Sequence, residues 1–340
     1  DTQLIVMVKA AAYGSGSREV AKLLEYKNVD YLAVAYADEG VELRESGIEL
    51  PILVLNPEEA IFDTLLRYHL EPEIYTLDLL RQFAHYTAEA GRFVPIHLKL
   101  DTGMHRLGFT KTELPELLTL LQQHSQLHIQ TIFSHLAVSE DPTQDAFTEQ
   151  QVATFHELYK KMASVLPYRP RRHILNSSGI VRFPQHQMDM VRLGIGLYGF
   201  DSSRQIQHDL KTVLTLKATI SQIKNLSPGE TVGYGRSGKV KHPMRTATIS
   251  IGYADGLLRK AGQGRFSVLV RGQPAPTFGN VCMDMTMIDV THIPEVREGD
   301  EVIIFGEDQS ITALAESLET IPYEVLTGVS QRVKRTYVQE

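Results

Sequence analysis

Cysteine is nearly absent from this sequence, since Cys282 is the only one among 340 residues. A single cysteine excludes a disulfide within the chain and favours a reducing compartment. Long apolar runs are also absent: no stretch approaches the ~20 residues that a membrane-spanning helix needs, and Asp1 opens no signal-peptide pattern. We therefore expect a cytoplasmic protein without a membrane segment.

A dominant charge is missing as well. The chain has 34 Lys and Arg residues against 41 Asp and Glu residues, a net charge of −7 with both signs interspersed. This balance argues against nucleic acid as a partner. The sequence contains no metal-ligand spacing, no nucleophile elbow and no Walker loop, so it predicts no metal site.

Eight short apolar runs alternate with helical patterns over the first two hundred residues. The runs are LIVMV (4–8), YLAVAY (31–36), PILVLN (51–56), LEPEIYT (70–76), PIHLKL (95–100), QTIFSHL (130–136), HILNS (173–177) and MVRLGIGLYG (190–199). Stretches between them, such as SREVAKLLEY (17–26), repeat apolar residues every three or four positions and indicate helices. The alternation predicts an α/β fold, a (β/α)8 TIM-type barrel over residues 1–204, with an open doubly wound sheet as the alternative.

The pattern changes after residue 204. TLKATISQIKNL (215–226), RFSVLVRGQPAP (265–276) and DEVIIFG (300–306) are typical of strands, with Gly and Pro at hairpin spacing. The sequence therefore predicts a mostly β C-terminal domain over residues 205–340, which begins near the polar run DSSRQ (201–205).

Lys9 ends the first apolar run, in VMVKAAAYGSGS (6–17). A lone lysine at a barrel mouth most simply extends to solvent. Here the preceding strand is wholly apolar, and the small residues that follow allow the backbone to approach a ligand closely. Since barrel enzymes carry their chemistry at the C-terminal ends of the strands, Lys9 is a candidate to form a Schiff base with an aldehyde cofactor, with its pKa lowered by desolvation.

The last two barrel strands carry the pattern of a phosphate site. NSSG (176–179) follows the seventh run and RLGIG (192–196) lies in the eighth. Backbone N–H groups and small hydroxyls in these loops commonly bind phosphate, although each fragment alone is an ordinary turn. Arg192 is then a cation inside the barrel, which requires an acceptor such as a ring nitrogen or a carboxylate.

Other polar residues have structural interpretations when each is taken alone. Lys99, Asp101 and Arg106 lie in KLDTGMHRLGF, where a salt bridge is the simplest reading. His135 ends the sixth apolar run, and Tyr253 follows a strand in a Gly-rich turn. Side chains of both kinds are more often structural than catalytic.

As a set, these segments resemble the alanine racemases. The matching motifs are VKAAAYGSGS, KLDTGMHRLGF, NSSG, RLGIGLYG, IGYADGLLR and GNVCMDMTMIDV, which occur in the family's order across nearly the whole chain. The resemblance implies a pyridoxal-phosphate-dependent isomerase of the barrel type. It also implies a homodimer that interconverts L-alanine and D-alanine for peptidoglycan synthesis.

The resemblance assigns catalytic roles to four residues. Lys9 would hold pyridoxal 5'-phosphate as a Schiff base and act as the base on one face of the substrate. Tyr253 of the partner subunit would be the base on the other face, and His135 would pair with that tyrosine. Arg192 would donate to the pyridine nitrogen, which would stay unprotonated because arginine does not readily give up a proton.

The remaining roles concern binding. Arg106 would lie near the phenolic oxygen of the cofactor and near the substrate, and the backbone of Met283 of the partner subunit would meet the substrate carboxylate. The residues implied for the phosphate are Tyr13, Ser177, Gly194, Ile195 and Tyr323.

The chain departs from the family pattern near Lys9. Ala11 stands where asparagine is usual and Ser15 where histidine is usual. The family has a strand and a helix before the lysine strand, whereas eight residues precede Lys9 here. This predicts a fragment or the end of a longer polypeptide, and YLAVAYADEGVELR (31–44) resembles racemases fused behind a cell-wall amino-acid ligase.

Two alternatives from other classes stay open. A barrel-type pyridoxal-phosphate decarboxylase expects a reactive cysteine in the second domain, a position that Cys282 could fill. A non-catalytic pyridoxal-phosphate carrier would be a single barrel, and the second domain argues against it.

Lys99 carries a separate prediction. The period of two in HLKLD puts His97, Lys99 and Asp101 on one face of the strand. An ammonium at Lys99 would repel Arg106, whereas a carbamate formed from CO2 would accept two hydrogen bonds from that guanidinium. Some alanine racemases carry this modification, so we predict a carbamate on Lys99, against the alternative of an ordinary contact with Asp101 or solvent.

Overall fold

The computed structural model describes residues 2–124 and 126–338. They form two compact units: the first takes in the residues up to Ala12 and Gly16–Leu210, and the second takes in Tyr13–Ser15 and the residues from Lys211 onward. Within the described residues, none of the helices combines the length and apolar content that crossing a membrane requires.

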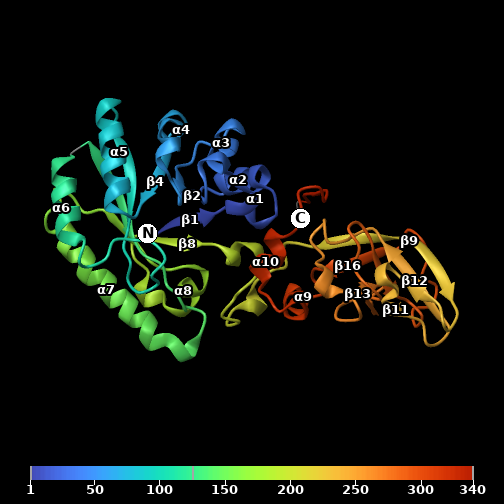
Figure 1. Cartoon of the computed structure of the whole chain (residues 1–340). Coiled ribbons are helices and arrows are strands. Elements are labelled where there is room, and N and C mark those ends of the chain that lie inside the picture. The colour runs from blue at the N-terminus through green and yellow to red at the C-terminus, as the bar shows by residue number, and fades with distance from the viewer. Residues whose placement is uncertain (1, 125, 339–340) are drawn as a thin grey trace. The chain divides into compact units, whose positions relative to one another are not determined.

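The first unit is built on a parallel sheet of eight strands within the described residues (Figure 1). The strands are β1 (Gln3–Met7), β2 (Tyr31–Val34), β3 (Ile52–Val54), β4 (Leu70–Ile74), β5 (Val94–Lys99), β6 (Leu127–Phe133), β7 (Arg171–His173) and β8 (Met190–Leu193). Their order is β7-β6-β5-β4-β3-β2-β1-β8. The Arg192 backbone N–H donates to the Leu175 carbonyl at 3.0 Å, which joins β8 to the chain beyond β7 and closes the ring. The predicted (β/α)8 barrel is confirmed.

Helices connect the strands and cover the outside of the barrel (Figure 1). They are α2 (Ser17–Tyr26), α3 (Ala37–Glu45), α4 (Phe62–Arg67), α5 (Leu77–Glu89), α6 (Leu114–Gln123), α7 (Asp145–Ala163) and α8 (Ser177–Arg182), with 3-10 turns η1 (Glu59–Ile61), η2 (Pro142–Gln144), η3 (Pro184–His186), η4 (Ile195–Tyr198) and η5 (Gln207–Asp209). In α7, the buried residues Val152, Phe155, Leu158 and Met162 recur every three or four positions, so one stripe of the helix faces the core. The eighth predicted strand is shorter than the run 190–199, because the chain enters η4 after Gly194.

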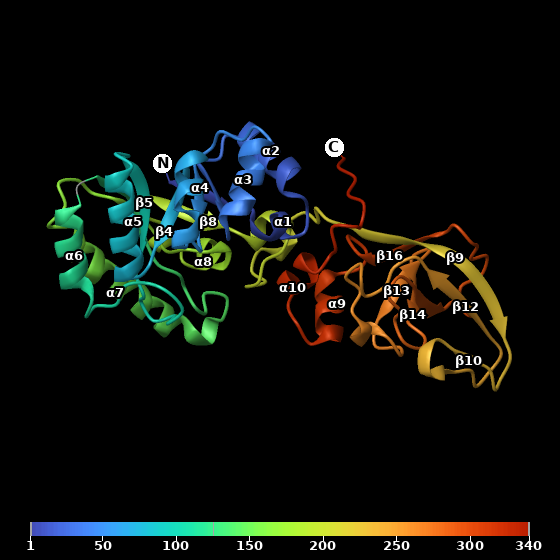
Figure 2. The ribbon, with the colours of Figure 1, turned by 45° about the horizontal axis from the view of Figure 1, so that its top comes forward.

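The second unit is mostly β-structure (Figure 2). Its antiparallel sheet has the order β14-β13-β16-β9-β12-β15. These strands are β9 (Leu216–Leu226), β12 (Met244–Ile249), β13 (Ser267–Val270), β14 (Gln273–Pro276), β15 (Thr286–Asp289) and β16 (Glu301–Phe305), accompanied by the small pair β10 (Thr231–Val232) and β11 (Gly238–Lys239), the 3-10 turns η6 (Tyr234–Arg236) and η7 (Arg259–Ala261), and the helices α9 (Ile311–Leu318) and α10 (Pro322–Thr327). An antiparallel bridge between Thr277 and Ile288 joins its two outer edges. The predicted β-rich second domain is confirmed.

The interior of the barrel is polar to an unusual degree. Its fully or nearly fully buried side chains include Glu73, His97, Lys99, Thr131, His173 and Arg192. Barrel interiors are normally filled by branched apolar residues. Because buried charges are costly unless they are paired, these side chains mark where the chemistry of the first unit lies.

Candidate active site

Lys9 stands at the start of an unusual turn. β1 ends at Met7, and the short element α1 (Lys9–Tyr13) follows it. The φ angles are 51° at Ala10, 53° at Ala11, 51° at Ala12 and 53° at Tyr13. The Ala12 N–H donates to the Val8 carbonyl at 2.9 Å, so α1 is one left-handed turn around Lys9. Left-handed backbone costs L-residues ~1–2 kcal/mol each. It could not be predicted from the sequence, because alanine normally favours right-handed helix.

The charges around Lys9 oppose one another. Burial lowers the pKa of Lys9, and the cationic side chain of Arg106 lowers it further. Glu39 raises that pKa, Lys99 lowers it, and Glu73 raises it. Burial and the two cations outweigh the two carboxylates, so Lys9 loses its proton more readily than an exposed lysine does. A neutral amine is the form that attacks an aldehyde or accepts a proton.

Lys99 lies opposite a buried acid. Its Nζ is 3.0 Å from Oε1 of Glu73, on the neighbouring strand β4, and both side chains are buried. Within the described residues, neither Glu73 oxygen receives a hydrogen bond of good geometry, so the contact is a charge pair. Burial lowers the pKa of Lys99 and raises the pKa of Glu73, while the attraction between them opposes both shifts. The expected alternative, a contact with Asp101, does not form, because that carboxylate accepts from the N–H groups of Gly103 and His105.

Arg192 is fixed inside the barrel by two histidines. Its Nη1 donates to Nδ1 of His173 at 2.5 Å, and its Nη2 donates to Nδ1 of His135 at 3.0 Å. Nη2 also donates to the carbonyls of Ser134 at 2.8 Å and Ile174 at 3.0 Å. Burial and the Arg192 charge hold the pKa of both histidines well below the usual range, so both are neutral. Burial also lowers the pKa of Arg192 to about 10, which leaves it charged at neutral pH.

A line of hydrogen bonds continues from His173 across the barrel. Its Nε2 lies 3.1 Å from Oγ1 of Thr131, which lies 2.8 Å from Nδ1 of His97, whose Nε2 lies 2.8 Å from Oε2 of Glu71. Arginine can only donate and an ionised carboxylate can only accept. The two ends therefore fix two directions: neutral His173 accepts from Arg192 at Nδ1 and donates from Nε2 to Thr131, and Nε2 of His97 donates to the Glu71 carboxylate.

The loops after β7 and β8 meet at Ser177. Asn176 caps α8, its side chain accepting from the Gly179 N–H at 2.9 Å. Oγ of Ser177 accepts from the N–H groups of Gly194 at 2.9 Å and Gly196 at 3.3 Å. The serine hydroxyl hydrogen can then point to an acceptor such as a phosphate oxygen. Ile195 is fully buried behind this contact.

The segment Tyr13–Ser15 belongs to the second unit. The rings of Tyr13 and Tyr323 lie 6.0 Å apart, and burial raises the pKa of Tyr13 above its usual range. Arg335 donates to the Gly14 carbonyl from Nη2 at 2.8 Å, and the Tyr337 hydroxyl donates to the Ser15 carbonyl at 2.9 Å. The two tyrosines expected at a phosphate, one in the anchored segment Tyr13–Ser15 and one in α10, are therefore neighbours within the second unit.

Tyr253 and Met283 lie on adjoining loops of the second unit. The N–H of Tyr253 donates to the Cys282 carbonyl, and that of Ala254 donates to the Met283 carbonyl, both at 3.0 Å. A Cβ at Gly252 would meet the Cys282 oxygen at 2.3 Å, so this close approach requires glycine. The side chains of Tyr253 and Met283 remain 39% and 52% exposed.

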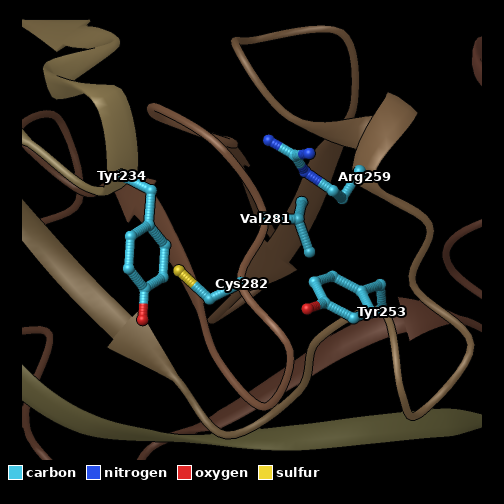
Figure 3. Close-up of a pocket in the computed structure, with 5 residues that line it drawn as sticks. All are labelled: Tyr234, Tyr253, Arg259, Val281 and Cys282. Atoms are coloured by element: carbon cyan, nitrogen blue, oxygen red, sulfur yellow. The ribbon is translucent and has the colours of Figure 1, made fainter.

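Tyr253 also borders a pocket of about 260 Å³ (Figure 3). Its lining residues are Tyr234, Tyr253, Arg259, Val281 and Cys282. In Figure 3 the Tyr253 hydroxyl points into the open space between the rings. The Tyr253 side chain is therefore accessible to a small molecule.

Two family models and many relatives match the chain. The alanine racemase N-terminal domain model covers residues 1–202 and the C-terminal domain model covers residues 213–337. Alanine racemase 1 of Clostridium acetobutylicum is 37% identical over 99% of this chain and 89% of its own length. The chain belongs to the alanine racemase family. It is therefore classed with the isomerases.

Solved structures agree with this assignment. Alanine racemase of Clostridium difficile 630 superposes with a TM-score of 0.93 at 34% identity, over 99% of this chain and 89% of that one. Alanine racemase of Bartonella henselae, with covalently bound pyridoxal phosphate, gives 0.91 at 30% identity, over 99% and 93% of the two chains. The alanine racemase family depends on this cofactor.

The residues of this chain fit pyridoxal phosphate. Lys9 offers a half-buried amine of lowered pKa, Arg192 offers a fixed donor in the barrel, and Ser177 offers a hydroxyl in the loop pair after β7 and β8. Several charged or titratable side chains of the first unit shift one another's pKa. They are Lys9, Lys99, Arg106, His135 and Arg192.

Four residues near this group did not stand out as functional in the sequence. Glu73 and Glu71 share one face of LEPEIYT, but the period of two does not say which face of the strand lies inside the barrel. His173 ends β7, directly below the NSSG turn. Glu39 gave no pattern that distinguishes it from the other acidic residues of α3.

Proposed function

We propose that this chain racemises alanine with pyridoxal phosphate and two bases, Lys9 and Tyr253 of the partner subunit, and so supplies D-alanine for peptidoglycan. The observation that carries the proposal is the half-buried amine of Lys9, with its lowered pKa, just after the C-terminal end of β1. Both halves of the chain match the alanine racemase family, which supports the same activity. We expect this reaction in the cytoplasm.

Lys9 would bind the cofactor covalently, and five further residues would hold its phosphate. These residues are Tyr13, Ser177, Gly194, Ile195 and Tyr323. Bound pyridoxal phosphate withdraws electrons from the α-carbon of the amino acid and so acidifies its C–H bond.

Arg192 would donate a hydrogen bond to the ring nitrogen of the cofactor. Its guanidinium keeps its protons because its pKa stays near 10. The two neutral histidines and two carbonyls around it hold the guanidinium in one orientation. The ring nitrogen would therefore stay unprotonated, which limits how much negative charge the ring accepts and disfavours side reactions.

The two bases would act on opposite faces of the α-carbon. The neutral amine of Lys9 would take or return a proton on one face. Tyr253 of the partner subunit would do so on the other through its phenolic oxygen. His135 accepts from Arg192 at Nδ1, so its Nε2–H is available to donate to that oxygen and stabilise the phenolate.

The substrate carboxylate would be oriented by Arg106 and by the backbone N–H of Met283 of the partner subunit. The guanidinium can bind a carboxylate with two parallel hydrogen bonds. Arg106 is exposed and Met283 is half exposed, so both can reach a small ligand. With its carboxylate held by these two groups, alanine would present a defined face to each base.

Mixed dimers test the proposal. Lys9→Ala and Tyr253→Phe should each be nearly inactive, the latter by ~10²–10⁴-fold. Random exchange gives half mixed dimers, each with one intact site, so about a quarter of the native activity should return. No recovery between subunits shown by mass spectrometry to exchange would contradict the shared site.

The decarboxylase remains the second candidate, because Cys282 lines the same pocket as Tyr253. Racemisation conserves the carboxylate, whereas decarboxylation releases CO2. Measurement of both products from L-alanine and from basic amino acids separates the two. CO2 release without change of optical rotation would favour the decarboxylase.

A further inference from the structure

The left-handed turn after Lys9 is held by a single carboxylate. Glu39 lies in α3, which follows β2. Its Oε1 accepts from the Ala10 N–H at 2.6 Å, and its Oε2 accepts from the N–H groups of Ala35 at 2.7 Å and Tyr36 at 3.2 Å. One side chain thus ties the first amide of the left-handed turn to the segment that enters α3.

Capping of α3 does not explain the whole arrangement. A glutamate in the first turn of a helix commonly accepts from the amide at the helix start, as Oε2 does here with Tyr36. The other oxygen reaches across to a different strand connection, 29 residues earlier in the chain. Hydrogen bonds to an ionised carboxylate are stronger than those between neutral groups. The bond to Ala10 therefore opposes the strain of four successive residues with positive φ.

We propose that Glu39 is a positioning residue for Lys9: it latches the left-handed turn to the neighbouring strand end and so fixes the direction in which the Lys9 amine leaves the barrel. This inference rests on the proposed role of Lys9 as cofactor lysine and base. It adds a residue outside the groups that would touch cofactor or substrate. The strained turn orients Lys9 only while the Ala10 N–H donates to the Glu39 carboxylate.

Glu39 also acts on the charge of Lys9. The groups that face this amine are Arg106 and Lys99, which lower its pKa, and Glu39 and Glu73, which raise it. Glu39 is the stronger of the two carboxylates. Removal of its charge leaves burial and the two cations less opposed, so the pKa of Lys9 falls further.

Two substitutions separate the effect of the length of the Glu39 side chain from the effect of its charge. Glu39→Gln keeps the length of the side chain but loses the charge and one acceptor oxygen. Glu39→Asp keeps the charge and can still cap α3, but it is one methylene too short to bridge to Ala10. Glu42→Gln, in the same helix with an exposed ion pair to Arg18, is the matched control.

The kinetic experiment uses the holoenzyme. Both Glu39 variants should lower kcat by ~10–100-fold with KM changed by less than ~3-fold, since small displacements of a reacting group cost about this much. Glu42→Gln should match the native enzyme. Native kcat in Glu39→Asp would overturn the latch, because it would mean that helix capping is sufficient.

Relief of the strain gives a second arm. Glycine adopts positive φ without penalty, so Ala11→Gly should restore part of the kcat lost in Glu39→Gln, by ~3-fold or more, while it leaves the native kcat unchanged or slightly lower. Ala21→Gly, a buried position in the right-handed helix α2, is the control for glycine itself. Equal effects of the two glycines in the Glu39→Gln background would overturn the role of strain.

A labelling arm needs no cofactor. The cofactor-free chain is treated with an amine-specific trinitrophenyl reagent over a range of pH, and labelled Lys9 is counted by peptide mass spectrometry. The half-point for Lys9 should move to lower pH by ~0.5–1 unit in Glu39→Gln and stay in place in Glu39→Asp and Glu42→Gln. An unmoved half-point in Glu39→Gln would overturn the charge effect. Failure of the racemase proposal would instead appear as native chain that does not bind pyridoxal phosphate at Lys9.

Discussion

The two units of this chain have opposite interiors. The barrel buries charged and titratable side chains, among them Glu73, His97, Lys99, His173 and Arg192. From residue 211 onward, the buried polar side chains of the described residues are those of Thr246, Thr277 and Thr286, and none of them is charged. The remainder of that core is apolar, with residues such as Val268 and Ile304 fully buried.

This difference shows where each unit carries its function. Buried charges cost free energy unless their partners are well placed, so the barrel interior is arranged for chemistry at some expense of stability. The β unit is stabilised by ordinary apolar packing, and its candidate groups lie on loops. The exposed side chains of Tyr253 and Met283 are examples. Substitutions inside the two units should therefore have different consequences.

Among substitutions in the interiors of the two units, the largest effect is expected from Arg192→Lys. Lysine keeps the charge but cannot hold both histidines and two carbonyls at once. We expect kcat to fall by ~10²–10³-fold, as for the loss of one oriented donor in a site. Steady-state kinetics of the folded variant measure this, with far-UV circular dichroism as the control. A kcat within ~3-fold of native would mean that the oriented guanidinium of Arg192 is not needed for the reaction.

An interior substitution in the β unit should act on stability instead. Ile304→Ala, on β16, should lower the free energy of unfolding by ~2–5 kcal/mol, with kcat unchanged at temperatures where the protein stays folded. Urea unfolding gives the first quantity. Val213→Ala, at a side chain that is 57% exposed, is the matched control and should change stability by less than ~0.5 kcal/mol. A large loss of kcat in folded Ile304→Ala would weaken the contrast between the units.

Much of the barrel could be predicted because its strands are short apolar runs bounded by helical patterns. The helix predicted over 17–26 has the bounds observed for α2. β8 ends six residues before the predicted run does, since glycine and apolar residues continue past the strand into η4. Sequence periodicity reports burial, and it does not distinguish a strand from the buried turn that follows it.

The site was less predictable for a different reason. The positions of Lys9 and Arg192 at strand ends could be read from the chain, whereas their partners Glu39 and His173 come from other elements, α3 and β7. Such pairings depend on strand order and register, which one sequence does not contain. The left-handed turn was hidden as well, because three successive alanines would normally favour a right-handed helix.

An intermediate effect concerns pH and the two histidines around Arg192. Their pKa lies well below 6.5 in the folded chain, while an unfolded chain protonates them near that value. As pH falls below ~6.5 the unfolded state binds more protons, so stability decreases by up to ~1.4 kcal/mol per pH unit for each histidine. Urea unfolding of native protein and of His173→Asn, between pH ~8 and ~5, isolates one of them.

The difference between those two proteins is the informative quantity. Glu73 has a raised pKa and contributes with the opposite sign, because it binds a proton in the folded state first. That contribution is common to both proteins and cancels. The native slope should be steeper by up to ~1.4 kcal/mol per pH unit. Equal slopes would show that His173 is not held neutral by folding.

The smallest effect is expected from CO2 and Lys99. The neutral amine of Lys99 would attack CO2, forming an N–C bond and releasing one proton, for which Glu73 at 3.0 Å is the nearest carboxylate. Burial favours the neutral amine, and the resulting carbamate would accept hydrogen bonds from Arg106. We expect a carbamate resonance after incubation with 13C-bicarbonate, and a loss of activity of a few-fold when CO2 is removed.

Lys99→Ala should abolish that resonance, while a substitution of the exposed Lys22 should leave it unchanged. Glu73→Gln then shows whether Lys99 carries a carbamate or stays an ammonium beside an ionised Glu73. If Glu73 takes up the proton, the amide variant should weaken the resonance and make activity more dependent on CO2. If Glu73 instead stays ionised and holds Lys99 as an ammonium, native protein will give no resonance, and the carbamate prediction fails. In that case the carboxylate of Glu73 itself supplies the negative charge beside the cations of the barrel, which is the role that the modification would otherwise have.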